Sequence, residues 1–141
     1  MIQIHIEGVE VPVINQELFC SWLEDVVVSE GAQLGDIQFV FCSDDYLLEI
    51  NRKYLNHDYF TDIITFDYSV DNFISGDLFV SIDRVSDNAA LYNCTVFNEF
   101  LRVCVHGVLH LLGYKDKAPK DIDIMRSKED LYLALYVSRG T

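Results

Sequence analysis

The chain has 141 residues, of which 50% are hydrophobic, and its formal net charge at pH 7 is −13. This length and apolar content predict a single domain, residues 1–141, with a substantial hydrophobic core. The charge argues against a general nucleic-acid binder. No apolar run reaches the roughly 18 residues of a membrane span, and the first residues lack the basic segment of a signal peptide.

The first half of the chain alternates strands with helices. Residues 2–7 alternate apolar and polar side chains, as a half-buried strand does. Asn15 is a typical helix cap, and the apolar spacing after it predicts a helix that ends at Gly31. Residues 37–42 are almost continuously apolar, which is typical of a central strand buried on both faces. Ser43 then caps a short helix with two acids in its first turn.

The second half begins with two strands, at residues 63–68 and 78–82, and Gly76 precedes the second of them. Because the link between them is short, we expect these strands to pair antiparallel. Residues 83–92 predict a helix, and Pro119 fits the first turn of the last helix.

A further, strongly apolar helix lies between these two and completes the order β-α-β-α-β-β-α-α-α. This order predicts an α+β (mixed α/β) fold, with one small mixed sheet of four strands and about five helices around it. The apolar helix follows a Thr95 cap and is expected to be central and buried all round.

Two histidines, His106 and His110, lie four residues apart on this central helix. That spacing places both imidazoles on one helical face, roughly 5–6 Å apart at Cβ. Gly113 tolerates the left-handed conformation that ends helices, so the chain is expected to turn there and return Asp116 towards the histidines. Three ligands and one open position are the pattern of a catalytic zinc site.

Other interpretations of the pair remain open. Histidines at this spacing are often ordinary core or surface residues, although a buried histidine needs a partner, which a shared metal would provide. Gly107 occupies the position where H-E-x-x-H metallopeptidases carry their glutamate base, which argues against a peptidase. Either another residue supplies the general base, or the metal activates the water without any side-chain base.

Other polar residues favour structural roles. Asp62 and Asp77 each lie at the start of a predicted strand. Because antiparallel strands start at opposite ends, both acids are not expected at one site, and a turn role is favoured for each. His5 and His57 are expected to be exposed. The four cysteines show no C-x-x-C spacing and predict reduced, mostly buried thiols in a cytoplasmic protein.

The charge is unevenly distributed. Residues 1–114 carry 4 basic and 18 acidic side chains, whereas residues 115–141 carry 6 and 5, so that −14 and +1 give the total of −13. Basic residues therefore gather just after the histidine motif, beginning with Lys115 and Lys117. They predict either a phosphate-binding rim beside the metal or an ordinary solvated surface with salt bridges.

Three segments in register make the chain resemble the bacterial YbeY family of endoribonucleases and rRNA maturation factors. His106 to Asp116 reads HGVLHLLGYKD, similar to the family's H-G-x-L-H-L-x-G-Y-D-H. Asn51 to Phe66 reads NRKYLNHDYFTDIITF, similar to N-x-x-Y-R-x-x-D-x-P-T-D-V-L-S-F. The third segment is Gly76 followed by an acid and an apolar strand. The resemblance covers most of residues 37–136.

The chain also departs from the family pattern. Asp116 takes the place of the third family histidine and Lys115 that of an acid, while the family arginine falls on Leu55. A carboxylate is an accepted zinc ligand, so the site survives the first change. If the family arginine binds substrate phosphate, Lys115 or Lys117 is our candidate to replace it.

The resemblance implies a zinc-dependent endoribonuclease, specific for single-stranded RNA, that acts in small-subunit rRNA maturation and ribosome quality control. The expected ligands of one zinc ion per chain are His106, His110 and Asp116, and the expected partners are rRNA and ribosomal or ribosome-assembly proteins, with no DNA or membrane. The alternative is a non-catalytic assembly factor with a structural or vestigial metal, whose fourth coordination position would be filled by protein.

Overall fold

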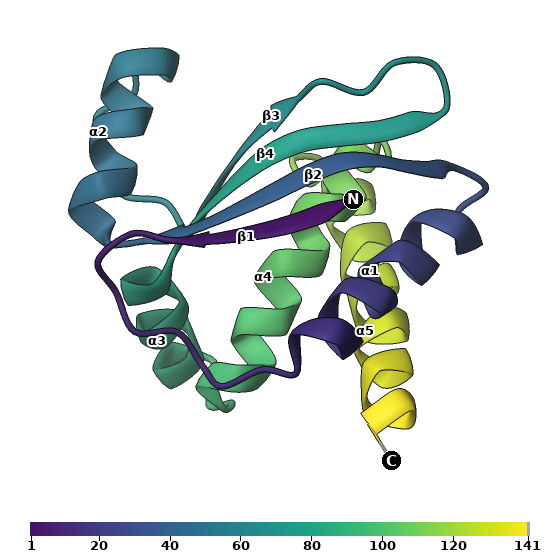
Figure 1. Ribbon diagram of the computed structural model, residues 1–141. Helices are drawn as coiled ribbons and strands as arrows, with labels where there is room; N and C mark the ends of the chain where they lie inside the picture. Colours follow the sequence, from purple (N-terminus) through teal and green to yellow (C-terminus); the bar gives the residue numbers. More distant parts are fainter. Residues whose placement is uncertain (141) are drawn as a thin grey trace.

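The computed structural model describes residues 1–140, which form one mixed four-stranded sheet with helices packed against it (Figure 1). The strands follow the order β1-β2-β4-β3 across the sheet. Both β1 and β4 pair parallel to β2, whereas β3 pairs antiparallel with β4, as expected from their short link. Their bounds are β1 (Ile2–Ile6), β2 (Gln33–Cys42), β3 (Ile63–Asp67) and β4 (Phe73–Ser81).

Five helices within residues 1–140 complete the α+β fold that was predicted. Figure 1 shows α1, α4 and α5 on the same side of the sheet, and α4 contacts β3, β4, α1, α3 and α5. The histidine helix, α4, is therefore central, as expected. The bounds are α1 (Gln16–Ser29), α2 (Asp44–Leu55), α3 (Ile82–Leu91), α4 (Val96–Leu111) and α5 (Pro119–Gly140).

The predicted helix caps are present. The side chains of Asn15, Ser43 and Thr95 each accept a hydrogen bond from a backbone N–H three residues further on. Each cap satisfies one of the amide groups that a helix start leaves without a partner. Gly113 has φ +103°, which confirms that the chain leaves α4 through a left-handed residue.

Two strand starts were predicted too late. β2 begins at Gln33 instead of residue 37, and β4 at Phe73 instead of residue 78. A register irregularity between Leu34 and Ile37 interrupts the apolar pattern of β2, so the sequence showed only its second half. Gly76 lies inside β4, where a Cβ atom would lie 2.6 Å from the carbonyl oxygen of Phe66. The glycine permits this close approach of backbone to backbone.

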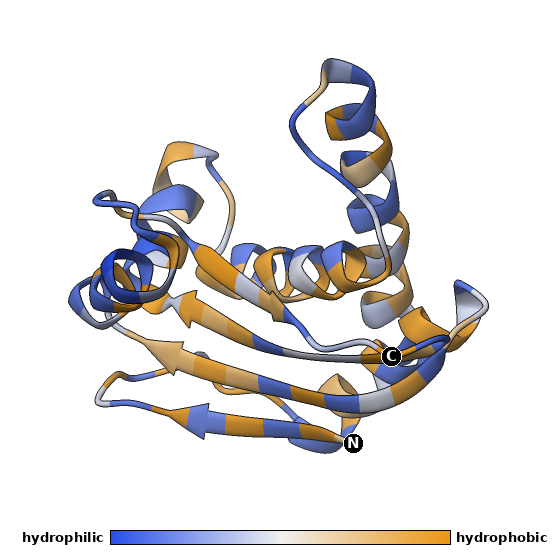
Figure 2. Cartoon of the chain, turned by 90° about the horizontal axis from the view of Figure 1, so that it is seen from above, coloured by the Kyte–Doolittle hydropathy of each residue, from blue (hydrophilic) through white to orange (hydrophobic). Residues whose placement is uncertain are grey.

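The prediction that β2 is buried on both faces was wrong. Ile37, Phe39 and Phe41 are fully buried against the helices, whereas the alternating Gln38 and Val40 are only half-buried. In Figure 2 hydrophobic and hydrophilic residues alternate along β1, whereas the C-terminal end of β2 is hydrophobic throughout. The sheet therefore has one core face and one partly covered face, as mixed sheets with helices gathered on one side do.

From Glu99 onwards burial along α4 is nearly continuous, with one exception, whereas Val96 and Phe97 in its first turn are exposed. Arg102, His106 and His110 are only half-buried and follow one another at a spacing of four, so they form a polar stripe along an otherwise buried helix. None of the helices within residues 1–140 has an apolar stretch long enough to cross a membrane. The four cysteines are free, and Cys42 and Cys104 are buried.

Candidate metal centre

The side chains of His106, His110 and Asp116 converge at the C-terminal end of α4. The two Nε2 atoms of the histidines lie 3.0 Å apart, and Asp116 Oδ2 lies 3.2 Å from each of them. Successive turns of α4 supply the imidazoles, and the turn at Gly113 brings the carboxylate back to them. The structure thus brings together the three residues that the sequence singled out, which we call the ligand group.

The other nitrogen of each imidazole is held by an acceptor. His106 Nδ1 donates to Glu129 Oε2 at 2.6 Å, and His110 Nδ1 donates to the carbonyl oxygen of Tyr114 at 2.9 Å. A carbonyl oxygen only accepts, so the Nδ1 atom of His110 carries the proton and its Nε2 atom presents a lone pair. Three groups able to donate an electron pair therefore face one another, and a bound cation stabilises such an arrangement.

The donor set fits zinc. Imidazole nitrogen and carboxylate oxygen bind Zn²⁺ at about 2.0–2.2 Å, so that tetrahedral ligands lie roughly 3.3 Å from one another. The observed separations of 3.0 to 3.2 Å are close to this value. Three protein ligands leave one tetrahedral position for water or substrate, which is the usual composition of a catalytic zinc site.

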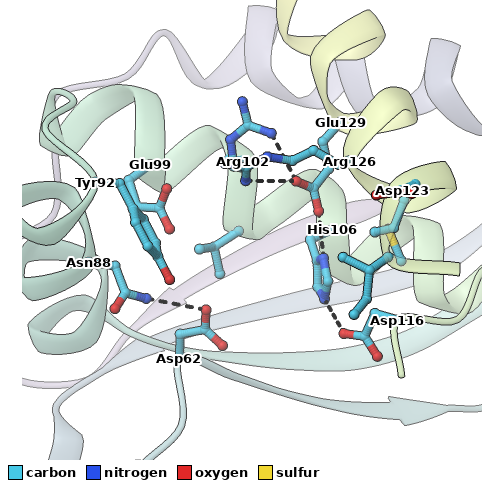
Figure 3. Close-up of a pocket in the computed structure, with 13 residues that line it drawn as sticks. Asp62, Asn88, Tyr92, Glu99, Arg102, His106, Asp116, Asp123, Arg126 and Glu129 are labelled. Atoms are coloured by element: carbon cyan, nitrogen blue, oxygen red, sulfur yellow. Dashed lines mark hydrogen bonds and ion pairs between the residues drawn. The ribbon is translucent and has the colours of Figure 1, made fainter. Parts of the chain in front are cut away.

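Glu129 orients His106 and is the main site residue that sequence reasoning missed. It is 5% exposed, and besides the imidazole it binds Arg102 Nη1 at 2.9 Å (Figure 3). Burial by itself lowers the pKa of His106, but the hydrogen bond that its Nδ1 donates to Glu129 and the negative charges around the imidazole outweigh burial, so the pKa is raised. A carboxylate behind a ligating histidine fixes the ring orientation and increases its basicity.

A signal for Glu129 was present in the sequence. It is a single acid on the apolar face of the last helix, among side chains that are all buried: Met125, Tyr132, Leu133 and Tyr136. A buried carboxylate needs a partner, and the candidates were the polar residues of another buried helix.

A second carboxylate, Glu30, holds the loop that carries Asp116. The hydroxyls of Tyr114 and Tyr132 both donate to Glu30, and Lys128 Nζ lies 3.0 Å from it. Burial raises the pKa of Glu30, but these three hydrogen bonds outweigh burial and lower it. Because the carbonyl of Tyr114 also orients His110, this network supports two members of the ligand group.

Two cavities meet at the ligand group. The first has a volume of about 470 Å³ and the second about 430 Å³, and His106 and Asp116 line both. The first cavity also contains Glu99, Arg102 and Arg126 (Figure 3). It is therefore a charged cavity with two guanidinium groups beside a candidate metal.

The second cavity differs in composition. No lysine or arginine is among its lining residues, all of which lie in the described part of the chain. It contains Leu55, His57 and Tyr59 next to His106, His110 and Asp116. The second cavity is less suited than the first to hold an anion, because no lysine or arginine lines it. Positive charge would come only from a metal bound at the ligand group.

Asp62 lines both cavities. It lies directly before β3, as predicted, but its side chain faces the site, and Asn88 Nδ2 lies 3.5 Å from it (Figure 3). Burial raises its pKa, and the same holds for Glu99. Asp77 lies within β4 beside Gln38 and Phe66, not at the strand-end turn predicted for it, and it lines neither cavity.

A sequence model of the family described as endoribonuclease YbeY matches residues 3–137. The chain belongs to the YbeY family. A protein named endoribonuclease YbeY from Flavobacterium johnsoniae is 52% identical over 122 residues, which cover 86% of this chain and 88% of that protein.

Other relatives extend the match to almost the full length. The endoribonuclease YbeY of Phocaeicola vulgatus is 47% identical over 135 residues, covering 96% of this chain and 98% of the relative. Among solved structures, the solution structure of TM1509 from Thermotoga maritima matches with a TM-score of 0.70 and 28% identity, covering 99% of this chain and 91% of that one. The sequence matches therefore place the chain in the YbeY family, and the TM1509 structure shares its fold.

The residues at the departures from the YbeY pattern lie in different places. Leu55, at the position of the family arginine, lines the second cavity. Lys115 and Lys117 are exposed on either side of Asp116 and line neither cavity. His5 and His57 are exposed, as predicted, but His57 also lines the second cavity.

Proposed function

We propose that the chain is a zinc-dependent endoribonuclease that cleaves single-stranded RNA, with one zinc ion held by His106, His110 and Asp116. The observation that carries this proposal is the convergence of three electron-pair donors within 3.2 Å at the border of two cavities, in a member of the YbeY family. The relatives' printed name supplies the reaction class.

The residues of the chain have separate tasks in this reaction. When bound, zinc supplies Lewis-acid chemistry to a phosphate oxygen and to an attacking water. Glu129 and the Tyr114 carbonyl hold the imidazoles in the tautomer that leaves both Nε2 atoms free to bind. Asp116 adds a negative charge that balances part of the charge of the ion.

The open surroundings of the ligand group favour an enzyme over a structural metal site. Within residues 1–140, the group of possible ligands contains three residues, and no further His, Cys, Asp or Glu joins it. A structural zinc site is usually closed by four protein ligands. Two cavities border the group instead, which supports an open fourth position for water or substrate.

We further propose that the protein acts in the cytoplasm in small-subunit rRNA maturation and ribosome quality control, in contact with ribosomal or assembly proteins. Its net charge of −13 opposes binding to bulk nucleic acid, so docking needs local cations or a protein partner. Lys115 and Lys117 are proposed to bind RNA phosphates at the rim, on either side of Asp116.

Arg126 is the competing candidate for the phosphate. It lines the first cavity, its side chain is 57% exposed, and its nearest acid, Glu129, is 3.8 Å away and already paired with Arg102. If the lysines bind phosphate, the Lys115→Ala/Lys117→Ala double variant loses RNA cleavage and Arg126→Ala does not. Full cleavage by the double variant would transfer this role to Arg126.

Metal content tests the proposed function directly. We expect about one zinc per untagged chain by mass spectrometry, lost in both His110→Ala and Asp116→Ala, together with cleavage of single-stranded RNA. Zinc lost only in His110→Ala would remove Asp116 from the ligand set. Wild-type protein that takes up no zinc would favour the non-catalytic assembly factor.

A further inference from the structure

Two aromatic side chains beside the ligand group neither belong to it nor hold its members in place. His57 and Tyr59 lie on the loop between α2 and β3, and both line the second cavity together with His106, His110 and Asp116. Both are exposed, and Tyr59 leaves 56% of its surface to solvent. Aromatic rings that stay exposed beside the ligand group need an explanation other than packing in the core.

The two rings form one preorganised surface. Their centroids lie 5.1 Å apart with an interplanar angle of 21°, and the Tyr59 hydroxyl shares a hydrogen bond of 3.0 Å with His57 Nδ1. The buried Asn51 anchors the loop from below, because its side chain donates to the carbonyl of Tyr59 and its own carbonyl accepts from the N–H of His57. The rings are therefore held in place without any ligand.

The chemistry of the second cavity favours a nucleobase as its occupant. A phosphate would need a cation, and the lining residues contain neither lysine nor arginine; the family arginine position is the apolar Leu55. Nucleobases stack on flat aromatic side chains, and unpaired bases in single strands are free to do so. Thr61 and Thr65 line the same cavity and supply hydroxyl groups for the base edge.

We propose that the His57–Tyr59 pair is a base-stacking subsite, which binds the base of a nucleotide next to the phosphate held at the ligand group. This inference rests on the proposed function and adds to it a binding direction. The single strand of RNA would pass from the charged first cavity, across the ligand group, to the aromatic second cavity. Such a subsite also disfavours duplex RNA, because paired bases are already stacked on their neighbours.

The test uses the zinc-loaded protein and a short single-stranded oligoribonucleotide whose cleavage position has been mapped. We expect Tyr59→Ala to raise KM about tenfold, within the roughly 5- to 150-fold that stacking supplies per base, with a much smaller change in kcat. Tyr59→Phe keeps the ring and is expected to stay near the wild-type KM. Tyr68→Ala is the matched control, since Tyr68 is 58% exposed and lines neither cavity.

A second measurement separates stacking from a merely structural effect. An abasic nucleotide placed in turn at each position of the substrate should raise the wild-type KM most at one position beside the cleaved bond. Tyr59→Ala should lose that position-dependent penalty while it keeps one zinc per chain. Equal penalties in wild type and Tyr59→Ala, with cleavage intact, would overturn the subsite and leave the proposed nuclease standing. A zinc-loaded wild type that cleaves no RNA would overturn both.

Discussion

Two acidic side chains from opposite ends of the chain support the ligand group, one by direct contact and the other through a third residue. Glu129 on α5 binds His106 directly at 2.6 Å and is also paired with Arg102. Glu30, at the end of α1, reaches the group only through Tyr114, whose carbonyl binds His110 and whose hydroxyl binds Glu30. Both carboxylates are well covered, with side chains 6% and 11% exposed.

The same residue type therefore supports the candidate metal centre in two ways. Glu129 sets the orientation and charge of one ligand, so its loss changes the donor itself. Glu30 holds a loop in place, so its loss changes how often that loop presents Asp116 and the Tyr114 carbonyl correctly. We therefore expect large effects on metal affinity at the first carboxylate and smaller ones at the second.

The largest effect is expected for Glu129→Ala. The imidazole of His106 loses its acceptor, and zinc affinity should fall about 10- to 100-fold. Arg102 also loses a partner, so the free energy of unfolding should fall by about 1–3 kcal/mol. Competition with a chelator of known affinity measures the first quantity, and urea denaturation measures the second.

Asp130→Ala is the matched control for Glu129. It removes the other carboxylate that binds Arg102, at 2.8 Å, but leaves His106 and its acceptor intact. Zinc affinity should stay near the wild-type value. Equal losses in the two variants would mean that Arg102, and not the orientation of His106, accounts for the effect of Glu129.

Tyr114→Phe is expected to have an intermediate effect. It removes the hydroxyl that ties the loop to Glu30 but keeps the backbone carbonyl that binds His110, so zinc affinity should fall less than tenfold. Tyr132→Phe removes the other tyrosine hydroxyl that donates to Glu30, but Tyr132 lies on α5, outside the loop that carries Asp116. Both variants should lose about 1 kcal/mol of stability, and only the first should bind zinc more weakly.

The smallest effects concern the pH dependence of stability and have opposite signs for two acids, the half-buried Glu30 and the buried Glu99. Hydrogen bonds lower the pKa of Glu30, so its stabilisation is present above the ordinary glutamate pKa of 4.5 and is lost as pH falls through the folded value. Burial raises the pKa of Glu99, so its ionised form destabilises the fold as pH rises above that ordinary value. At pH 7, Glu30→Gln should therefore lose stability and Glu99→Gln should gain it.

Urea denaturation at pH 7 and near pH 4, at constant zinc loading, measures both changes. Each should be about 1 kcal/mol or less at neutral pH. Both should shrink towards acidic pH, where the two carboxyls become protonated in the folded and unfolded states alike. A loss of stability for Glu99→Gln at pH 7 would show that its carboxylate makes a favourable contact that outweighs the cost of burial.

Much of the fold was predictable because its signals are local. A cap and its helix are separated by three residues, so Asn15, Ser43 and Thr95 could be assigned from sequence and are confirmed. The spacing of His106 and His110 follows from helix geometry alone. The starts of β2 and β4 were predicted too late, because register is decided by neighbouring strands. Gly76 pairs with Asp67 inside β4 and is approached closely by the Phe66 carbonyl, and neither contact is visible in the sequence.

The sequence by itself determined the helices, the α+β class and the three members of the ligand group. These three residues lie within eleven consecutive positions, from His106 to Asp116. Only the tertiary structure decided what surrounds that group. Glu30 and Glu129 come from 84 and 23 residues away in sequence to bind Tyr114 and His106, and Asp62 and Tyr59 arrive on a different loop. Contacts between distant segments depend on how whole elements pack, and no local pattern contains that information.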